Sequence, residues 1–206
     1  ADNLQHFPIG IFAIPLAVAC FPYLSESIVK GEKDKFGVHF SVTFRRIIFL
    51  IVPASLFIFF LRAQIVRLIL GAGKFSWEDT ILTLQTLGYF SLSLFAQALI
   101  PLLARSFYAF QDTKTPVVIS LFSVGLNIVF AIYLGRLMGA PGLALAFSLA
   151  MIINFIILII ALKSKQVWLD GKKILSSTLK IILIGLVSAI FLQAAKSVSY
   201  THLTLP

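Results

Sequence analysis

The chain has 206 residues, of which 59% are hydrophobic and 12% charged, and its mean hydropathy is +1.00. Soluble domains carry about 25% charged residues, so this composition excludes a soluble globular domain and predicts an all-α, polytopic bundle of membrane helices. A net charge of +9 would suggest nucleic-acid binding in a soluble protein. In a membrane protein, basic cytoplasmic loops explain it, and we expect no nucleic-acid partner.

Six apolar segments are long enough to cross a bilayer, which takes about 20 helical residues. The second and third exceed one crossing, and we expect each to include an interfacial extension. The six predicted spans are residues 4–24, 47–70, 81–110, 117–134, 143–162 and 174–192.

Both ends of the sequence indicate a piece of a longer protein. The chain begins at Ala1 without a methionine and enters a span almost at once, so we expect further helices upstream. Residues 198–206, VSYTHLTLP, resemble a translated sequencing adaptor, and we assign them no role. We expect the protein's own sequence to fill residues 1–195 and to continue past the sixth span.

The first predicted span carries a proline every seven residues, at Pro8, Pro15 and Pro22. This spacing places the three rings near one helix face, and each ring removes a backbone donor. We expect Pro22 to end the span and Pro15 to kink or break it. Broken helices in transporters line a cavity. A kink satisfied by neighbouring helices is the alternative.

Four polar residues, Asp2, Asn3, Gln5 and His6, precede this span at its predicted outer mouth. Asp2 and His6 are four residues apart and face the same way on a helix, and a histidine can respond to pH. Together with Pro15, the four are candidates for lining a substrate cavity. The alternative is an interfacial cap in which Asp2 or Asn3 accepts hydrogen bonds from the first helical turn.

Basic residues are unevenly divided between the two sides of the predicted bundle. The positive-inside rule places the richer side, with the loops after the first, third and fifth spans, in the cytoplasm. Lys180 lies inside the last span and can reach toward that side. The richer side holds Lys30, Lys33, Lys35, Arg45, Arg46, Arg105, Lys114, Lys163, Lys165, Lys172 and Lys173, and the other side Arg62, Arg67, Lys74, Arg136 and Lys196.

Arg45 and Arg46 open the second predicted span at its cytoplasmic end. The guanidinium fork suits phosphate, although arginines at this position also serve as plain topology anchors.

The segment FYAFQDTKTPV, residues 107–117, places a polar loop between two spans. Pro116 suits the first turn of the next helix, and Asp112 or Thr113 can cap that helix. We interpret the loop as structural first. The alternative is a gate in which Asp112 or Lys114 pairs with another loop. The candidate loop and gating residues are Arg45, Arg46, Arg105, Asp112, Lys114 and Thr115.

The few amides inside the predicted spans more often bond neighbouring helices than bind a substrate; they are Gln97, Asn127 and Asn154. In the fifth span, Gly142, Ala146 and Ala150 form a small-residue stripe that predicts close helix packing. The sequence has no phosphate-binding loop and no arrangement that suggests a nucleophile. Its histidines are too scattered for a metal site. We expect no enzymatic activity, no cofactor and no metal.

Three segments resemble the MurJ/MviN lipid II flippases of the multidrug/oligosaccharidyl-lipid/polysaccharide exporter superfamily. They are ADNLQHFPIGIF with FPYLSE, then GAGKFSWEDT, then FYAFQDTKTPV, in residues 1–26, 71–80 and 107–117. The resemblance runs from residue 1 to about residue 195. It implies a two-lobe fold of about fourteen helices, of which this chain would supply the eighth to the thirteenth.

The resemblance also implies a function. Such a flippase would move lipid II, an undecaprenyl-pyrophosphate-linked glycolipid, from the cytoplasmic to the outer leaflet of the bacterial inner membrane by alternating access. The membrane potential or an ion gradient would drive it. The lipid tail would lie in a groove of which the sixth span forms one wall. We expect a monomer whose partners are membrane lipids and cell-wall synthesis proteins.

One position departs from the family pattern. The family often has arginine where this chain has Asn3, and an amide supplies neither the charge nor the fork for a pyrophosphate. Other cargoes therefore stay open: another lipid-linked oligosaccharide, or a drug exchanged for a cation. A non-transporting membrane scaffold for cell-wall synthesis is the alternative from a different class.

Overall fold

A computed structural model describes residues 6–70, 77–165, 171, 176–185, 187 and 188. Regular structure within these ranges is entirely helical. A π-helix, η1 (Ile9–Ala13), is followed by α2 (Ile14–Val29), α3 (Lys33–Leu70), α4 (Trp77–Ala109), α5 (Lys114–Met138) and α6 (Ala140–Ser164). A shorter apolar helix covers Ser176–Gly185.

Five of the described helices are long and apolar enough to cross a membrane, which confirms the expected polytopic helix bundle. They are His6–Val29, Lys33–Val66, Thr80–Ala109, Lys114–Met138 and Ala140–Ser164. Ser176–Gly185 falls within the sixth predicted span, residues 174–192, whose other positions lie mostly outside the described ranges.

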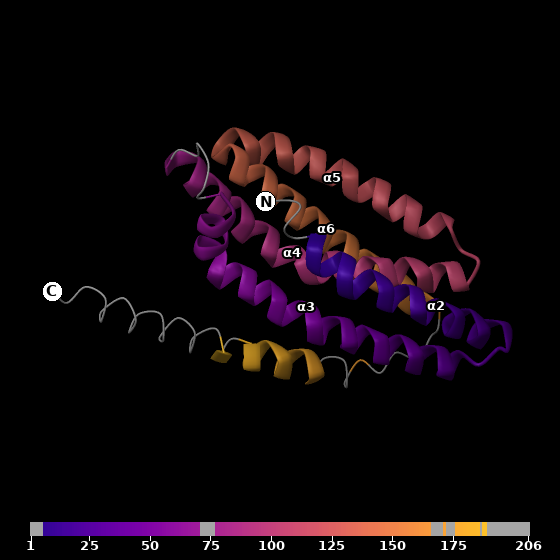
Figure 1. Cartoon of the computed structure of the whole chain (residues 1–206). Coiled ribbons are helices and arrows are strands. Elements are labelled where there is room, and N and C mark those ends of the chain that lie inside the picture. The colour runs from indigo at the N-terminus through magenta and orange to yellow at the C-terminus, as the bar shows by residue number, and fades with distance from the viewer. Residues whose placement is uncertain (1–5, 71–76, 166–170, 172–175, 186, 189–206) are drawn as a thin grey trace.

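Helix α4 lies at the centre of the bundle (Figure 1). It packs against η1, α2, α3 and α6, and α6 lies between it and most of α5. In the most apolar window of α4, 61% of the residues are buried, against 6% in α5. Helix α5 therefore turns nearly all of its apolar surface outward, toward lipid or another protein segment.

Helix α3 begins well before the predicted span at residue 47. Phe36, Phe40 and Phe44 recur every four residues on its early turns, and all three are buried. Burying each ring contributes about 2 kcal/mol, which keeps this segment helical although it precedes the apolar run. Arg45 and Arg46, which were predicted to open the second span, therefore lie inside α3 and not at the start of a helix.

Helices η1 and α2 follow one another as a single interrupted helix. The π-helical turn ends at Ala13, and Pro15 is the second residue of α2. The helix thus departs from α geometry just before the proline whose missing N–H disturbs the regular bonding. The prediction that Pro22 ends the span was wrong, since α2 continues through it to Val29. The fully buried Ala17 and Leu24 hold the segment against its neighbours on both sides of that proline.

Schellman motifs end α2 and α4, each with one residue in the left-handed conformation. Gly31 has a φ of 72° after α2, and Gln111 has a φ of 57° after α4. In each motif the next amide, of Glu32 or Asp112, donates to the carbonyl five positions earlier, as this cap requires. Two connections at one end of the bundle therefore use the same turn with different residues.

Helices α5 and α6 approach closely beside the turn that joins them. Gly139 makes this turn with φ 66° and ψ −138°, a conformation open in practice only to glycine. A Cβ atom on Gly142 would collide with the backbone oxygen of Leu134. Gly142, Ala146 and Ala150 are all buried, which confirms the packing face predicted from their spacing.

Candidate functional site

A cationic cavity of about 600 Å³ lies between α2, α3 and the helix Ser176–Gly185. Arg45 and Arg46 line it from α3, and Lys180 and Ser177 line it from the shorter helix. The remaining lining side chains are apolar. Positive charge is thus gathered between three helices that also offer hydrophobic surface.

The charges of this cationic cavity are not neutralised by the described carboxylates. None of the ion pairs among the described residues involves Arg45, Arg46 or Lys180. Arg45 Nε donates to the carbonyl oxygen of Ser41 on its own helix at 3.2 Å. Like charges near low-dielectric surroundings repel one another, so an anion bound between them would be stabilised.

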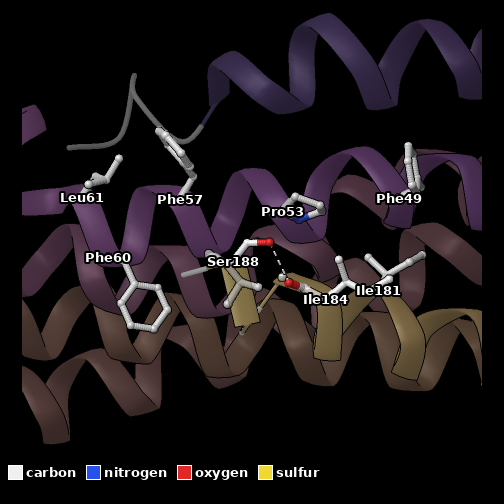
Figure 2. Close-up of a pocket in the computed structure, with 10 residues that line it drawn as sticks. Phe49, Pro53, Phe57, Phe60, Leu61, Ile181, Ile184 and Ser188 are labelled. Atoms are coloured by element: carbon white, nitrogen blue, oxygen red, sulfur yellow. Dashed lines mark hydrogen bonds between the residues drawn. The ribbon is translucent and has the colours of Figure 1, made fainter. Parts of the chain in front are cut away.

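An apolar groove lies along α3 next to the cationic cavity, and Figure 2 shows the side chains that line it. Phe49 and Ile181 line both the cavity and the groove, which then passes Pro53, Phe57 and Ile184. The polar side chain in its lining is Ser188, whose Oγ donates to the carbonyl oxygen of Ile184 at 2.9 Å. Because that hydroxyl is satisfied within its own helix, the groove offers hydrocarbon contact.

A polar recess of about 320 Å³ adjoins the cationic cavity on the side nearer the start of α3. It shares Arg46 with the cavity and is also lined by Tyr23, His39, Thr43 and Cys20. The rings of Tyr23 and His39 stack with centroids 5.5 Å apart. Hydroxyl and imidazole groups both donate and accept hydrogen bonds, so the recess suits a neutral polar group.

Asp112 holds the connection between α4 and α5. Its Oδ1 accepts a hydrogen bond from the Thr115 amide at 3.1 Å, and its Oδ2 accepts one from Thr115 Oγ1 at 2.8 Å. Lys165 Nζ, just past the end of α6, lies 2.6 Å from the same Oδ2. Lys165 first, and then Thr115, lower the pKa of Asp112 to about 2, since each stabilises the carboxylate. Of the two predicted capping residues, Asp112 makes these bonds, while Thr113 makes no side-chain cap bond.

The structure describes two of the five candidates for lining a substrate cavity. Asp2, Asn3 and Gln5 lie outside the described residues, while His6 begins the first helix. Pro15 is exposed on α2.

The two other gating candidates stand apart from the cationic cavity. Arg105 Nη1 donates to the carbonyl oxygen of Pro101 on its own helix at 3.2 Å. Lys114 is exposed at the start of α5. Arg45 and Arg46 are therefore the gating candidates that line the cationic cavity.

Three features of the site were not predicted from the sequence. Lys180 was interpreted from the sequence as a side chain that reaches toward the cytoplasmic side, although a charged residue inside an apolar span is by default a functional candidate. The Asp112–Lys165 pair and the Tyr23–His39 stack could not be predicted from neighbouring residues in the sequence, since each joins residues on different helices or connections.

A chain of polar side chains crosses the interface between α4 and α6. Ser148 Oγ donates to the Tyr89 carbonyl oxygen at 2.8 Å, and Ser93 Oγ donates to Ser148 Oγ at 3.1 Å. Gln97 Nε2 donates to Ser93 Oγ on the same helix at 2.9 Å, and the bond that crosses to α6 is made by Ser93. The buried Oδ1 atoms of Asn127 and Asn154 accept no hydrogen bond from the described part of the chain.

Comparison with known proteins shows one consistent likeness. The family model described as Lipid II flippase MurJ matches residues 1–205. A relative from Bdellovibrio bacteriovorus, described as a probable lipid II flippase MurJ, is 29% identical over 94% of this chain and 37% of its own length. A relative from Thermotoga maritima with the same description is 32% identical over 79% of this chain and 33% of its own length.

A solved structure gives the same result in three dimensions. It is described as lipid II flippase MurJ in an inward closed conformation, and it superposes with a TM-score of 0.81 at 25% identity. The superposition covers 94% of this chain and 39% of the solved one. The chain therefore spans about two-fifths or less of the length of these proteins.

Proposed function

The chain belongs to the lipid II flippase MurJ family, and we propose that it serves to move lipid II from the cytoplasmic to the outer leaflet of the bacterial inner membrane by alternating access. One observation carries this proposal. Nearly the whole bundle, 94% of the chain, superposes on a solved flippase with a TM-score of 0.81. We further propose that transport requires no cofactor and no chemical conversion of the cargo.

The chain would supply most of one lobe of a larger transporter. Its five long helices and the shorter Ser176–Gly185 would be the eighth to the thirteenth of about fourteen helices. The match to 39% of the length of the solved flippase supports this placement. A moving lobe has to expose polar surface to the head group while its outer face stays in lipid. The polar recess, the cationic cavity and the outward apolar surface of α5 support such a division.

Rescue of growth tests the proposed cargo. The gene for this chain, with the reading frame that adjoins it, is expressed in bacteria depleted of their own lipid II flippase. We expect growth and the amount of lipid II in the outer leaflet to recover together. If the protein reaches the membrane and neither recovers, lipid II is not the cargo. Another lipid-linked oligosaccharide or a scaffold role then becomes the better explanation.

A further inference from the structure

We propose that a second apolar cavity, beside Arg62, holds one anionic phospholipid of the outer leaflet as a resident part of the bundle. The phosphate would lie on the Arg62 guanidinium group, and one acyl chain would fill the cavity. This lipid is not the cargo. Its binding therefore goes beyond the proposed function and does not depend on which cargo the protein moves.

The second apolar cavity has a volume of about 350 Å³ and lies between α3, α4 and the helix Ser176–Gly185. Two of the hydroxyl groups in its lining are satisfied within their own helices. Ser55 Oγ donates to the Val52 carbonyl oxygen at 2.8 Å. Ser91 Oγ donates to the Gly88 carbonyl oxygen at 2.7 Å. The cavity therefore offers hydrocarbon contact, which is the environment that an acyl chain prefers.

Leu56 separates this cavity from the apolar groove of the candidate site. It lines both spaces, and a Cβ atom on Gly185 would collide with its Cδ1 atom. The Leu56 side chain therefore packs directly on the backbone of the shorter helix and closes the gap between the two spaces. On the other side, Leu92 lines the second cavity from α4 and is 51% exposed, so the cavity opens toward the surrounding lipid.

Arg62 lies at one end of the second cavity, between α3 and α4. Its Cζ atom is 4.9 Å from the ring centroid of Phe59, which lines the cavity. Its Nη1 atom occupies the space that a Cβ atom on Gly88 would take. None of the ion pairs among the described residues involves Arg62. A cation inside an apolar span without a described carboxylate partner is by default a functional candidate.

The position of Arg62 along α3 agrees with the depth of an outer-leaflet phosphate. Arg46 and Arg62 are sixteen residues apart, which is about 24 Å along a helix and approaches the roughly 30 Å of the hydrocarbon core. The distribution of basic residues assigns the Arg46 end to the cytoplasmic side, so Arg62 lies toward the outer side. From Phe60 back to Ile48 the cavity lining covers twelve residues, about 18 Å. An acyl chain that crosses one leaflet covers a similar length, roughly 15 Å.

Charge favours an anionic phospholipid as the occupant. A single guanidinium group balances the single negative charge of a phosphodiester, and its fork can bind two phosphate oxygens. Phosphatidylglycerol adds no further charge to the phosphodiester. Phosphatidylcholine carries a cation that the guanidinium group would repel. We therefore expect phosphatidylglycerol to be preferred.

Site-specific photo-crosslinking tests the lipid site. The protein, prepared with its adjoining reading frame, is placed in nanodiscs that contain phosphatidylcholine and phosphatidylglycerol in a known ratio. A benzophenone amino acid replaces Phe95, which lines the cavity, or Phe147 on α6 as the matched control. Both side chains are partly buried, and each packs edge-on against another phenylalanine ring. We expect more lipid to be captured from position 95 than from position 147. We also expect phosphatidylglycerol to be enriched about fivefold over the nanodisc ratio at position 95.

Charge removal then tests the role of Arg62. We expect Arg62→Gln to return the captured lipid at position 95 to the nanodisc ratio. The total amount captured there should stay unchanged, which shows that the cavity is still folded. Arg62→Lys keeps the charge and should retain part of the enrichment. Arg136→Gln, which removes an exposed cation on α5, should leave the enrichment unchanged.

Each result decides the proposal. Undiminished enrichment in Arg62→Gln would overturn the role of the guanidinium group, and equal capture from positions 95 and 147 would show that no lipid enters the cavity. If lipid II at equal concentration displaces phosphatidylglycerol from position 95, the cavity belongs to the cargo path and the proposal is wrong. Growth rescue by the unaltered protein reports separately on the proposed function, so the two proposals can fail independently.

Discussion

The carboxylate of Asp112 and the ammonium group of Lys165 lie 2.6 Å apart and join the α4–α5 connection to the end of α6. Their side chains are 18% and 36% exposed, so water screens the pair in part. We expect Asp112→Asn to lower the free energy of unfolding by about 1 kcal/mol. A double-mutant cycle with Lys165→Met isolates the pair, and zero coupling energy would contradict its role.

Acid should weaken the same pair. The pKa of Asp112 is lowered from 3.8 to about 2, so the folded state binds this proton less readily than the unfolded state. The stabilisation is therefore complete above the unfolded pKa and is lost as pH falls from about 4 to about 2. Unfolding measured at about pH 5 and about pH 2.5 should show a smaller loss for Asp112→Asn than for the unaltered protein. Equal losses would refute this assignment.

The two Schellman motifs provide a matched pair of substitutions. Gln111 adopts a left-handed conformation that strains a residue with a Cβ atom, so Gln111→Gly should raise the free energy of unfolding by about 0.5 to 1 kcal/mol. Gly31→Ala introduces the same strain and should lower it by about 1 kcal/mol. Thermal or denaturant unfolding measures both changes. The two substitutions should change the free energy of unfolding in opposite directions. A loss of stability in Gln111→Gly would show that the backbone strain at Gln111 is relieved in another way.

Close packing of α5 on α6 should make Gly142 intolerant of a side chain. In Gly142→Ala the new methyl group would meet the backbone of Leu134, and we expect a loss of about 1 to 3 kcal/mol as the helices separate. Gly125→Ala on α5 is the control, because nothing lies within 4 Å of a Cβ atom there. That change should be neutral or stabilise by up to about 1 kcal/mol through helix propensity. Similar losses at both positions would argue against a packing contact.

Asn3 and His6 remain candidates from the sequence for lining the transport cavity. If they meet the polar head group, replacing both with leucine should reduce transport, because apolar side chains cannot satisfy it. Growth and outer-leaflet lipid II in the depletion strain provide the measurement, with Val117→Leu on the exposed face of α5 as the control. Full activity of the double variant at normal expression would exclude the pair from the cargo path.

The helices could be predicted from hydropathy because a bilayer admits few other structures. The boundaries could not be predicted where tertiary burial outweighs local signals. Burial of Phe36 and Phe40 lets α3 begin well before the predicted span. Pro22 lies inside α2, although this proline was expected to end the span. At the site, Arg45, Arg46 and Asp112 were found because charged residues stand out in an apolar sequence. Lys165 and the Tyr23–His39 stack became visible only in three dimensions.

Helix α3 is long enough to work as a lever. Its 38 residues extend about 57 Å at 1.5 Å per residue, nearly twice the roughly 30 Å of hydrocarbon that it has to cross. About 27 Å therefore reaches beyond the lipid when the helix stands upright. The 14 residues before the predicted span at residue 47 make up about 21 Å of this length, so a change of about 10° in tilt would move that tip by about 4 Å. A small rocking motion inside the membrane would thus be magnified at the end that holds Phe36 against Phe110.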